Sequence, residues 1–123
     1  MTPIHLPMPP STNHLYANVS GKGRRKTKRY ADWITDSGWL LQRQRPLKFR
    51  GWVVLDLTCP RHDEKRRDVS NFVKAVEDLL VRHGVIEDDS KVWEVRARWG
   101  AKHAVCERLN LIVVRVWPAE VTV

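Results

Sequence analysis

Residues 69 to 82 carry apolar side chains at the spacing of an amphipathic α-helix, and this segment is the strongest constraint on the fold. On a wheel of about 100° per residue, a broad apolar arc contains Val69, Phe72, Val76, Leu79 and Leu80. Such an arc is stable only when it is buried, because a helix this short gains little stability in isolation. We therefore expect the helix, which ends near Gly84, to pack against a sheet formed by apolar segments elsewhere in the chain.

The other regular segments are predicted from hydrophobic periodicity and from turn residues. Strands are predicted at residues 4–8, 52–59, 90–99 and 108–117. A second helix is predicted from Lys28 to Gln44. Its buried stripe is predicted to contain Tyr30, Trp33, Ile34, Leu40 and Leu41. Residues 11 to 27 are rich in Ser, Asn, Gly and basic residues, which predicts a loop.

The predicted elements follow one another in the order β-α-β-α-β-β within a single domain that covers residues 1–123. This order is typical of an α/β (α+β) fold in which helices pack on a small mixed sheet. The last two strands are expected to pair as a hairpin, since a short turn segment separates them. Cys59 and Cys106 lack the C-x-x-C spacing of a structural zinc site, and we interpret them as packing residues.

The chain is strongly basic, with 22 Lys and Arg residues against 14 Asp and Glu residues and a formal net charge of +8. A polyanion is its natural partner, and nucleic acid is favoured over a lipid surface because no amphipathic anchor is evident. A membrane partner is not expected, since no apolar run approaches the roughly 20 residues of a membrane span. The first residues lack the layout of a signal peptide, which favours a cytoplasmic location.

Basic residues concentrate in two segments that are candidates for binding DNA. Residues 21 to 30 contain Lys22, Arg24, Arg25, Lys26, Lys28 and Arg29. We expect this glycine-containing segment to be mobile until it meets phosphate groups, and a solvated loop without a partner is the alternative. Arg66 and Arg67 directly precede Asp68, where they would bring a backbone phosphate to the acid or would simply form a charged turn.

Carboxylates gather at the two ends of the central helix. Asp68 precedes the helix, and the adjacent Asp88 and Asp89 follow it. One polar edge of the helix, at positions i, i+3 and i+7, carries Asn71, Lys74 and Asp78. In the simplest interpretation Asp68 is an N-cap, Lys74 and Asp78 form a surface ion pair, and the following acids belong to a solvated turn.

The alternative interpretation is a magnesium site in which acids from the two ends of the helix converge. Magnesium prefers oxygen ligands, and between carboxylates it offsets the charge of a phosphodiester and orients a water molecule. Lys74 would share the charge that develops on the phosphate. A basic surface around an acidic pocket is typical of a nuclease, although the residues by themselves leave both interpretations open.

Two segments together resemble one known family. Residues 66 to 92 read "RRDVSNFVKAVEDLLVRHGVIEDDSKV", and residues 6 to 17 read "LPMPPSTNHLYA". Both are similar to patterns of the RusA family of Holliday junction resolvases, and with the order of elements the resemblance covers nearly the whole chain. It implies a homodimer that binds four-way junctions and other branched DNA and resolves them by paired nicks during recombination and repair. It also implies Mg²⁺ as the cofactor, with Mn²⁺ able to substitute, in a bacterial or phage-infected cell.

The resemblance assigns roles residue by residue. Asp68, Asp88 and Asp89 match the acids that hold the metal ion and the attacking water. Lys74 matches a catalytic lysine, and the supporting positions are Ser70, Asn71 and Asp78. In the N-terminal segment, Asn13 and His14 are candidates for contacting phosphate.

Ser70 is a departure, since it stands where the family pattern carries a second aspartate. Either Asp88 or Asp78 completes the metal shell, or Ser70 acts through a metal-bound water, or the metal is held weakly. The last possibility keeps open a second function, a non-catalytic structure-specific DNA-binding protein. An RNA-directed nuclease or RNA-binding protein is a third.

The chain contains six tryptophans, which is many for its length. Those on predicted strands are interpreted as core or dimer packing residues in preference to platforms for DNA bases: Trp52, Trp93, Trp99 and Trp117. Trp33 and Trp39 lie on the first predicted helix, where one of them could face DNA or a partner subunit.

Overall fold

The computed structural model describes residues 2–61, 68–101 and 110–121. Its elements, with η marking a 3-10 helix, are β1 (Ile4–Pro7), η1 (Thr12–His14), β2 (Tyr16–Val19), β3 (Gly23–Lys26), α1 (Lys28–Arg43), β4 (Val53–Cys59), η2 (Val69–Phe72), α2 (Val73–Arg82), η3 (Asp89–Lys91), β5 (Val92–Trp99) and β6 (Leu111–Pro118). None of the helices in these ranges is long and apolar enough to cross a membrane. Cys59 is buried on β4, whereas Cys106 and most of the predicted turn before the last strand lie outside the described residues.

Four strands form one mixed sheet in the order β1-β6-β4-β5. β4 pairs with β5 in parallel and with β6 in antiparallel orientation, and β1 pairs with β6 in antiparallel orientation. The predicted hairpin between the last two strands is therefore wrong, because β4 lies between β5 and β6. β4 is buried along almost its whole length, as is typical of a central strand with a neighbour on each edge.

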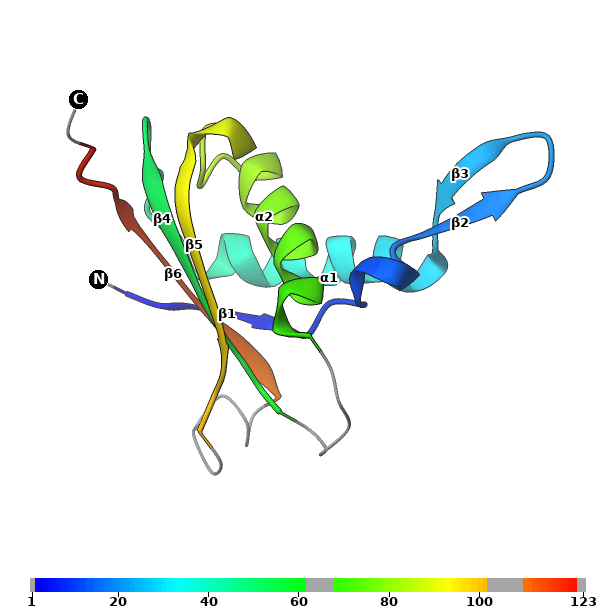
Figure 1. Ribbon diagram of the computed structural model, residues 1–123, viewed down its shortest axis with the longest axis horizontal. Helices are drawn as coiled ribbons and strands as arrows, with labels where there is room; N and C mark the ends of the chain where they lie inside the picture. Colours follow the sequence, from blue (N-terminus) through cyan, green and yellow to red (C-terminus); the bar gives the residue numbers. More distant parts are fainter. Residues whose placement is uncertain (1, 62–67, 102–109, 122–123) are drawn as a thin grey trace.

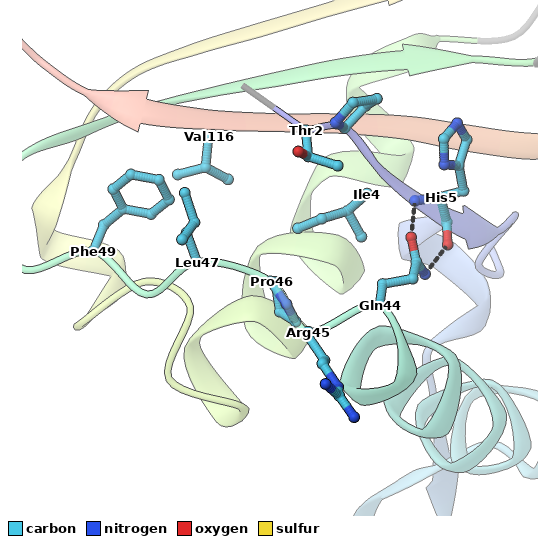
Figure 2. Close-up of a pocket in the computed structure, with 10 residues that line it drawn as sticks. Thr2, Ile4, His5, Gln44, Arg45, Pro46, Leu47, Phe49 and Val116 are labelled. Carbon is cyan, nitrogen blue, oxygen red and sulfur yellow. Dashed lines mark hydrogen bonds between the residues drawn. The ribbon is translucent and has the colours of Figure 1, made fainter.

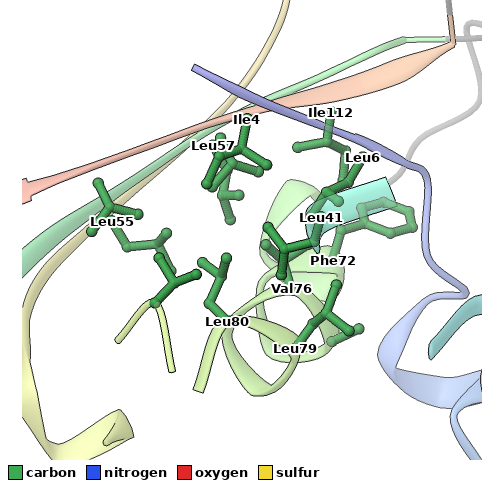
Figure 3. Packing of buried hydrophobic residues seen from close by; sticks show 14 of the residues in the cluster. Ile4, Leu6, Leu41, Leu55, Leu57, Phe72, Val76, Leu79, Leu80 and Ile112 are labelled. Carbon is green, nitrogen blue, oxygen red and sulfur yellow. The ribbon is translucent and has the colours of Figure 1, made fainter. Parts of the chain in front are cut away.

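Both α-helices lie on one side of this sheet (Figure 1). The core lies between the helices and the sheet, and Figure 3 shows Leu55 and Leu57 of β4 among the side chains that fill it. Of the predicted apolar arc, the buried residues are Phe72, Val76, Leu79 and Leu80, and Val69 is partly buried against them. The predicted fold class, an α+β domain with helices packed on a small mixed sheet, is confirmed.

The buried stripe of α1 differs from the predicted one. Its predicted members that are buried are Tyr30, Trp33 and Leu41, with Ile34 partly buried. Leu40 is 38% exposed, because Ser37 and Gly38 hold the inner positions of this turn. A Cβ atom at Gly38 would lie only 2.7 Å from Nε2 of His83, the residue that follows α2. Gly38, an unfavourable residue in the interior of a helix, therefore lets α1 approach the end of α2 closely.

The central helix begins with a turn of 3-10 helix, so α-helical geometry starts at Val73 and not at Val69. The first turn is closed by a hydrogen bond between residues three apart, as in a 3-10 helix: the Asn71 N–H donates to the Asp68 carbonyl oxygen at 3.1 Å. The Ser70 N–H donates to the Asp68 side chain. This cap places Asp68 at the outer start of the helix.

Residues 11 to 27 were expected to form a loop, but they contain η1 and the hairpin of β2 and β3, which we call the arm. The two strands pair in antiparallel orientation, with Tyr16 opposite Lys26. Gly21 and Gly23, at and after the turn, have φ of +72°, a backbone conformation that other residues rarely adopt. Every side chain of the two strands is exposed, so hydrophobic alternation does not reveal them. Figure 1 shows the arm projecting away from the sheet and helices.

Candidate functional site

Asp68 is exposed at the start of η2, where its carboxylate caps the first turn. Its Oδ1 accepts a hydrogen bond from the Ser70 N–H at 3.1 Å. Hydrogen bonds from the Ser70 side chain and then from its backbone lower the pKa of Asp68, because they stabilise the charged form. The predicted N-cap is confirmed. At neutral pH the carboxylate is ionised and one side of it remains open to solvent.

Asn71 joins the two sequence segments that carry the family resemblance. Its carbonyl oxygen accepts a hydrogen bond from Oγ1 of Thr12 at 2.8 Å. Thr12 begins η1, the short turn that also contains Asn13 and His14. The His14 ring is in turn held by a 2.8 Å hydrogen bond between its Nδ1 and Oγ of Ser11. The N-terminal motif therefore lies beside the start of the central helix, close to Asp68.

Lys74 and Asp78 form the ion pair that their spacing predicts. Nζ of Lys74 lies 3.1 Å from Oδ1 of Asp78, and the two side chains are 54% and 35% exposed. The hydrogen bond and the charge of Asp78 raise the pKa of Lys74, and the charges of Glu77 and Asp89 add to this effect. A pair this exposed contributes only about 0.3–0.5 kcal/mol to stability, so its ammonium group remains available to an anionic ligand.

Asp88 and Asp89 lie together at the start of η3, beyond the end of α2. The Asp88 carboxylate accepts hydrogen bonds from the side chain and backbone of Ser90, which lower the pKa of Asp88. The charge of Asp89 adds to the raised pKa values of Lys74 and Glu77, both on α2. The acidic pair is therefore associated with Lys74.

The expected convergence of Asp68 with Asp88 and Asp89 does not occur within one chain. Figure 1 shows the start of η2 and the η3 turn at opposite ends of the central helix. The four residues of η2 and the ten of α2 form one continuous helical rod that spans roughly 20 Å. Within the described ranges, no three His, Cys, Asp or Glu side chains form a group that could hold a metal ion. The roles of these acids remain predictions.

Glu77 belongs to this region, although the sequence analysis did not select it. Its side chain is partly buried on α2. Burial raises the pKa of Glu77, the charge of Lys74 opposes this effect, and the charges of Asp78 and Asp89 add to it. The i, i+3 spacing from Lys74 is a signal that could have identified Glu77, because residues at this spacing are neighbours on a helix.

Replacing Glu77 with glutamine is expected to stabilise the protein at neutral pH. A raised folded-state pKa means that the folded protein holds this proton more tightly than the unfolded chain, whose value is near 4.5. Stability therefore falls as pH rises through the window above 4.5, and the ionised carboxylate is unfavourable at pH 7. Glu77→Gln should raise Tm at pH 7 by about 1–3 °C, and this gain should disappear below pH 4.

Thermal unfolding followed by circular dichroism at pH 7 and pH 3.5 measures the effect. Glu120→Gln, at an exposed position near the C-terminus, is the matched control and should show a smaller change at both pH values. A gain of the same size at both pH values would show that the charge of Glu77 is not its cause.

The comparison with known proteins adds to this geometry. A family model described as Endodeoxyribonuclease RusA matches residues 7–116. The chain belongs to the RusA family. The Crossover junction endodeoxyribonuclease RusA of Escherichia coli strain K12 is 31% identical to it over 99 residues, covering 76% of this chain and 78% of that protein. The protein of the same name from Aquifex aeolicus strain VF5 is 28% identical over 95 residues, covering 73% of this chain and 71% of that protein. A relative from Enterobacteria phage 82 is 31% identical over 99 residues.

The RusA match includes the arm, where most of the predicted DNA-binding residues lie. Four cations of the arm are exposed, namely Lys22, Arg24, Arg25 and Lys26. The Arg24 guanidinium lies 4.8 Å from the centre of the Tyr16 ring, which itself meets Tyr30 of α1 edge to face at 5.8 Å. Lys28 pairs with Asp32 at 3.0 Å, and Arg29 is exposed on the first turn of α1. The predicted contacts of Arg66 and Arg67 lie outside the described residues.

Two cavities of this RusA chain are lined by described residues that do not include Asp68. A cavity of about 590 Å³ is lined by Ile4, Leu47, Phe49 and Val116, and Figure 2 shows it beside Gln44, which hydrogen bonds the backbone of His5. A smaller cavity of about 160 Å³ lies between the base of the arm and the two helices. Its charged lining residues are Lys26, Asp78 and Arg82. The smaller cavity links the arm to the polar edge of α2.

Proposed function

We propose that this chain is a structure-specific endodeoxyribonuclease that resolves Holliday junctions and other branched DNA by paired nicks, in recombination and repair. The observation that carries the proposal is the match to the RusA family over residues 7–116, within which the two motif segments lie in contact through Thr12 and Asn71. The relatives named above are crossover junction endodeoxyribonucleases. The basic arm and the net charge of +8 supply the attraction for a polyanion that such an activity needs.

Lys74 is the residue that we propose to stabilise charge on the phosphate. Its ammonium group lies on the exposed polar edge of α2, and Asp78 holds it there at 3.1 Å. Asp89 is near enough to influence the pKa of Lys74, so a phosphate bound at Lys74 would also lie near the acidic pair. An ammonium group positioned in this way lowers the barrier because charge increases on the phosphate oxygens during the reaction.

We also propose Mg²⁺ as the cofactor, with Mn²⁺ able to substitute. A site of Asp68, Asp88 and Asp89 from one chain does not fit, because the described residues contain no group of three His, Cys, Asp or Glu side chains that could hold a metal ion. The adjacent Asp88 and Asp89 do fit, because magnesium usually takes one or two carboxylates and completes its shell with water and substrate phosphates. The chemistry it supplies when bound is neutralisation of phosphate charge and activation of water.

The proposed active form is a homodimer, because paired nicks on opposite strands require two sites. The side of the sheet opposite the two helices carries no described helix (Figure 1), and it offers a face for a second copy. Within this sheet, the Asp56 side chain of the central strand β4 is 4% exposed, and its Oδ2 lies 2.8 Å from a guanidinium nitrogen of Arg98 on β5. Sedimentation of the DNA-free protein at micromolar concentration should give the mass of two chains.

A four-way junction with each strand labelled in turn tests the proposed activity. Incubation with Mg²⁺ or Mn²⁺ should give nicks at symmetric positions in two opposing strands, while a linear duplex of the same sequence should remain intact. Symmetric nicks that require the divalent ion would support both the activity and the cofactor. Cleavage that persists in excess chelator would contradict the cofactor alone.

The second candidate is a non-catalytic structure-specific DNA-binding protein. It is favoured by one observation, the lack of a three-ligand metal group among the described side chains. The same assay separates the two functions, since retarded junction bands without nicked products would indicate the DNA-binding protein.

A further inference from the structure

Trp52 and Trp93 form an exposed aromatic pair at the end of the sheet where β5 begins. They are 39% and 54% exposed, so of the two expected roles, core packing or dimer packing, core packing is excluded for both residues. Their rings meet edge to face, with centroids 5.4 Å apart and planes at 74°. Nζ of Lys91 lies 4.8 Å from the centre of the Trp52 ring. Two accessible aromatic rings and a cation are therefore gathered at one place.

A β-bulge at Trp93 and a backbone hydrogen bond at Trp52 position the two tryptophans. Val53 is opposite Val92, but Val54 is opposite Glu94, so Trp93 is the extra residue of a β-bulge. Bulges of this kind redirect a side chain, and they are common beside active sites. The Trp52 carbonyl oxygen accepts a hydrogen bond from the Ala119 N–H at 2.9 Å, which fixes the neighbouring strand end.

The aromatic pair is also close in the chain to the acidic pair. Lys91 ends η3, the turn that contains Asp89, and its N–H donates to the Asp88 carbonyl oxygen at 3.0 Å. Trp93 follows two residues later. A ligand that contacts the tryptophans therefore lies beside the carboxylates that the proposed function places in the nuclease site.

We propose that Trp52, Trp93 and Lys91 form a stacking platform for unpaired bases of branched DNA. The choice of DNA as the ligand rests on the proposed function. Aromatic side chains stack on the faces of bases, and these faces are accessible only where bases are unpaired, as at a branch point. The Glu87 carboxylate accepts a hydrogen bond from the Gly51 N–H at 2.9 Å, next to Trp52 in the chain, and its charge repels phosphates, so the strand presents its bases to this part of the surface.

A second copy of the chain fits this surface less well. Lysine is depleted from the cores of protein interfaces, and Lys91 covers one face of the Trp52 ring.

Binding of unpaired DNA without a divalent metal tests the platform separately from cleavage. The probes are a fluorescent oligothymidine and a four-way junction with unpaired thymines at its centre, followed by anisotropy. Trp52→Ala and Trp93→Ala should each weaken binding about ten-fold, while Trp52→Phe, which keeps an aromatic face, should lose less. Leu40→Ala is the control, because Leu40 is 38% exposed on α1 and has no expected contact with DNA, so its replacement should leave binding unchanged.

Two results would overturn the platform. One is DNA binding by both tryptophan-to-alanine variants that equals that of Leu40→Ala, with circular dichroism and Tm showing that the variants are folded. The other is loss of self-association by the DNA-free alanine variants, which would assign the surface to a second copy. A wild-type protein that cuts junctions while its tryptophan variants bind normally contradicts only the platform. Tryptophan-dependent binding by a protein that never cuts contradicts only the proposed nuclease.

Discussion

Replacing Asp89 with asparagine is expected to slow cleavage of a four-way junction by at least roughly 100-fold, with junction binding unchanged. Asparagine keeps the size of the side chain and removes its charge. A carboxylate that positions a metal ion or the attacking water contributes several kcal/mol to the transition state, and each 1.4 kcal/mol corresponds to about ten-fold in rate. Asp68→Asn should have a similar effect, provided that its carboxylate does more than cap η2.

Single-turnover assays with enzyme in excess measure the cleavage step, and anisotropy without divalent metal measures binding. Asp36→Asn is the matched control, because Asp36 is an exposed acid on α1 and should leave both quantities unchanged. Cleavage at the wild-type rate by both Asp68→Asn and Asp89→Asn would show that these acids only cap their turns.

The separation of Asp68 from Asp89 makes a mixing experiment informative. Each site could use Asp68 of one protomer and Asp89 of its partner. In that case a mixed dimer of the two asparagine variants contains one intact site, and it should nick one strand of each junction. If one chain supplies both acids, every site in the mixture retains an asparagine and the mixture stays inactive. The comparison is possible because the two acids lie on separate elements, with Asp68 capping η2 and Asp89 in η3.

Removing three charges from the arm is expected to weaken junction binding by up to roughly 500-fold at 0.1 M salt. The variant carries glutamine at Lys22, Arg24 and Arg25, which preserves polarity and much of the side-chain length. Each cation that neutralises a phosphate releases a counterion, so the plot of log affinity against log salt should become less steep by about 2.7. Anisotropy titrations at several salt concentrations measure both quantities.

A second triple variant controls for total charge. Three exposed cations, Arg43 at the end of α1 and Lys48 and Arg50 before β4, are replaced by glutamine, which lowers the net charge by the same three units. This control variant should change the slope of log affinity against log salt much less than the arm variant does, because its three residues are not on the arm. Equal losses in the two variants would mean that net charge, and not the arm, determines binding.

The arm shows why part of the DNA-binding surface was predicted and part was not. Its cations are evident from sequence, because their density between residues 21 and 30 needs no structural context. Its hairpin was missed, because both strands are fully exposed and carry no apolar alternation. The hairpin is held at its base by Tyr16 against Tyr30 and by a hydrogen bond from the Thr27 N–H to the Leu15 carbonyl oxygen at 3.0 Å. These contacts join residues whose pairing a local pattern does not predict.

The acidic residues around α2 likewise include features that the sequence predicted and features that it did not. The capping role of Asp68 and the pair of Lys74 with Asp78 depend on spacing within one helix, and both were predictable. The position of Asp89 near Glu77 depends on how the chain turns back after α2, and sequence spacing does not contain this information. For the same reason the convergence of Asp68 with Asp89 was expected and is not found in one chain.

The amino-acid sequence alone determined both α-helices, all four strands of the mixed sheet and the apolar arc of α2, because their periodicities are local and burial enforces them. It also pointed to the RusA family, through two short motifs that the fold brings into contact at Thr12 and Asn71. Only the tertiary structure decided that β4 separates β5 from β6, that α2 holds its flanking acids apart, and that a bulge exposes Trp93. Strand order and register arise from pairing between distant segments, so they become defined only when the whole core is assembled.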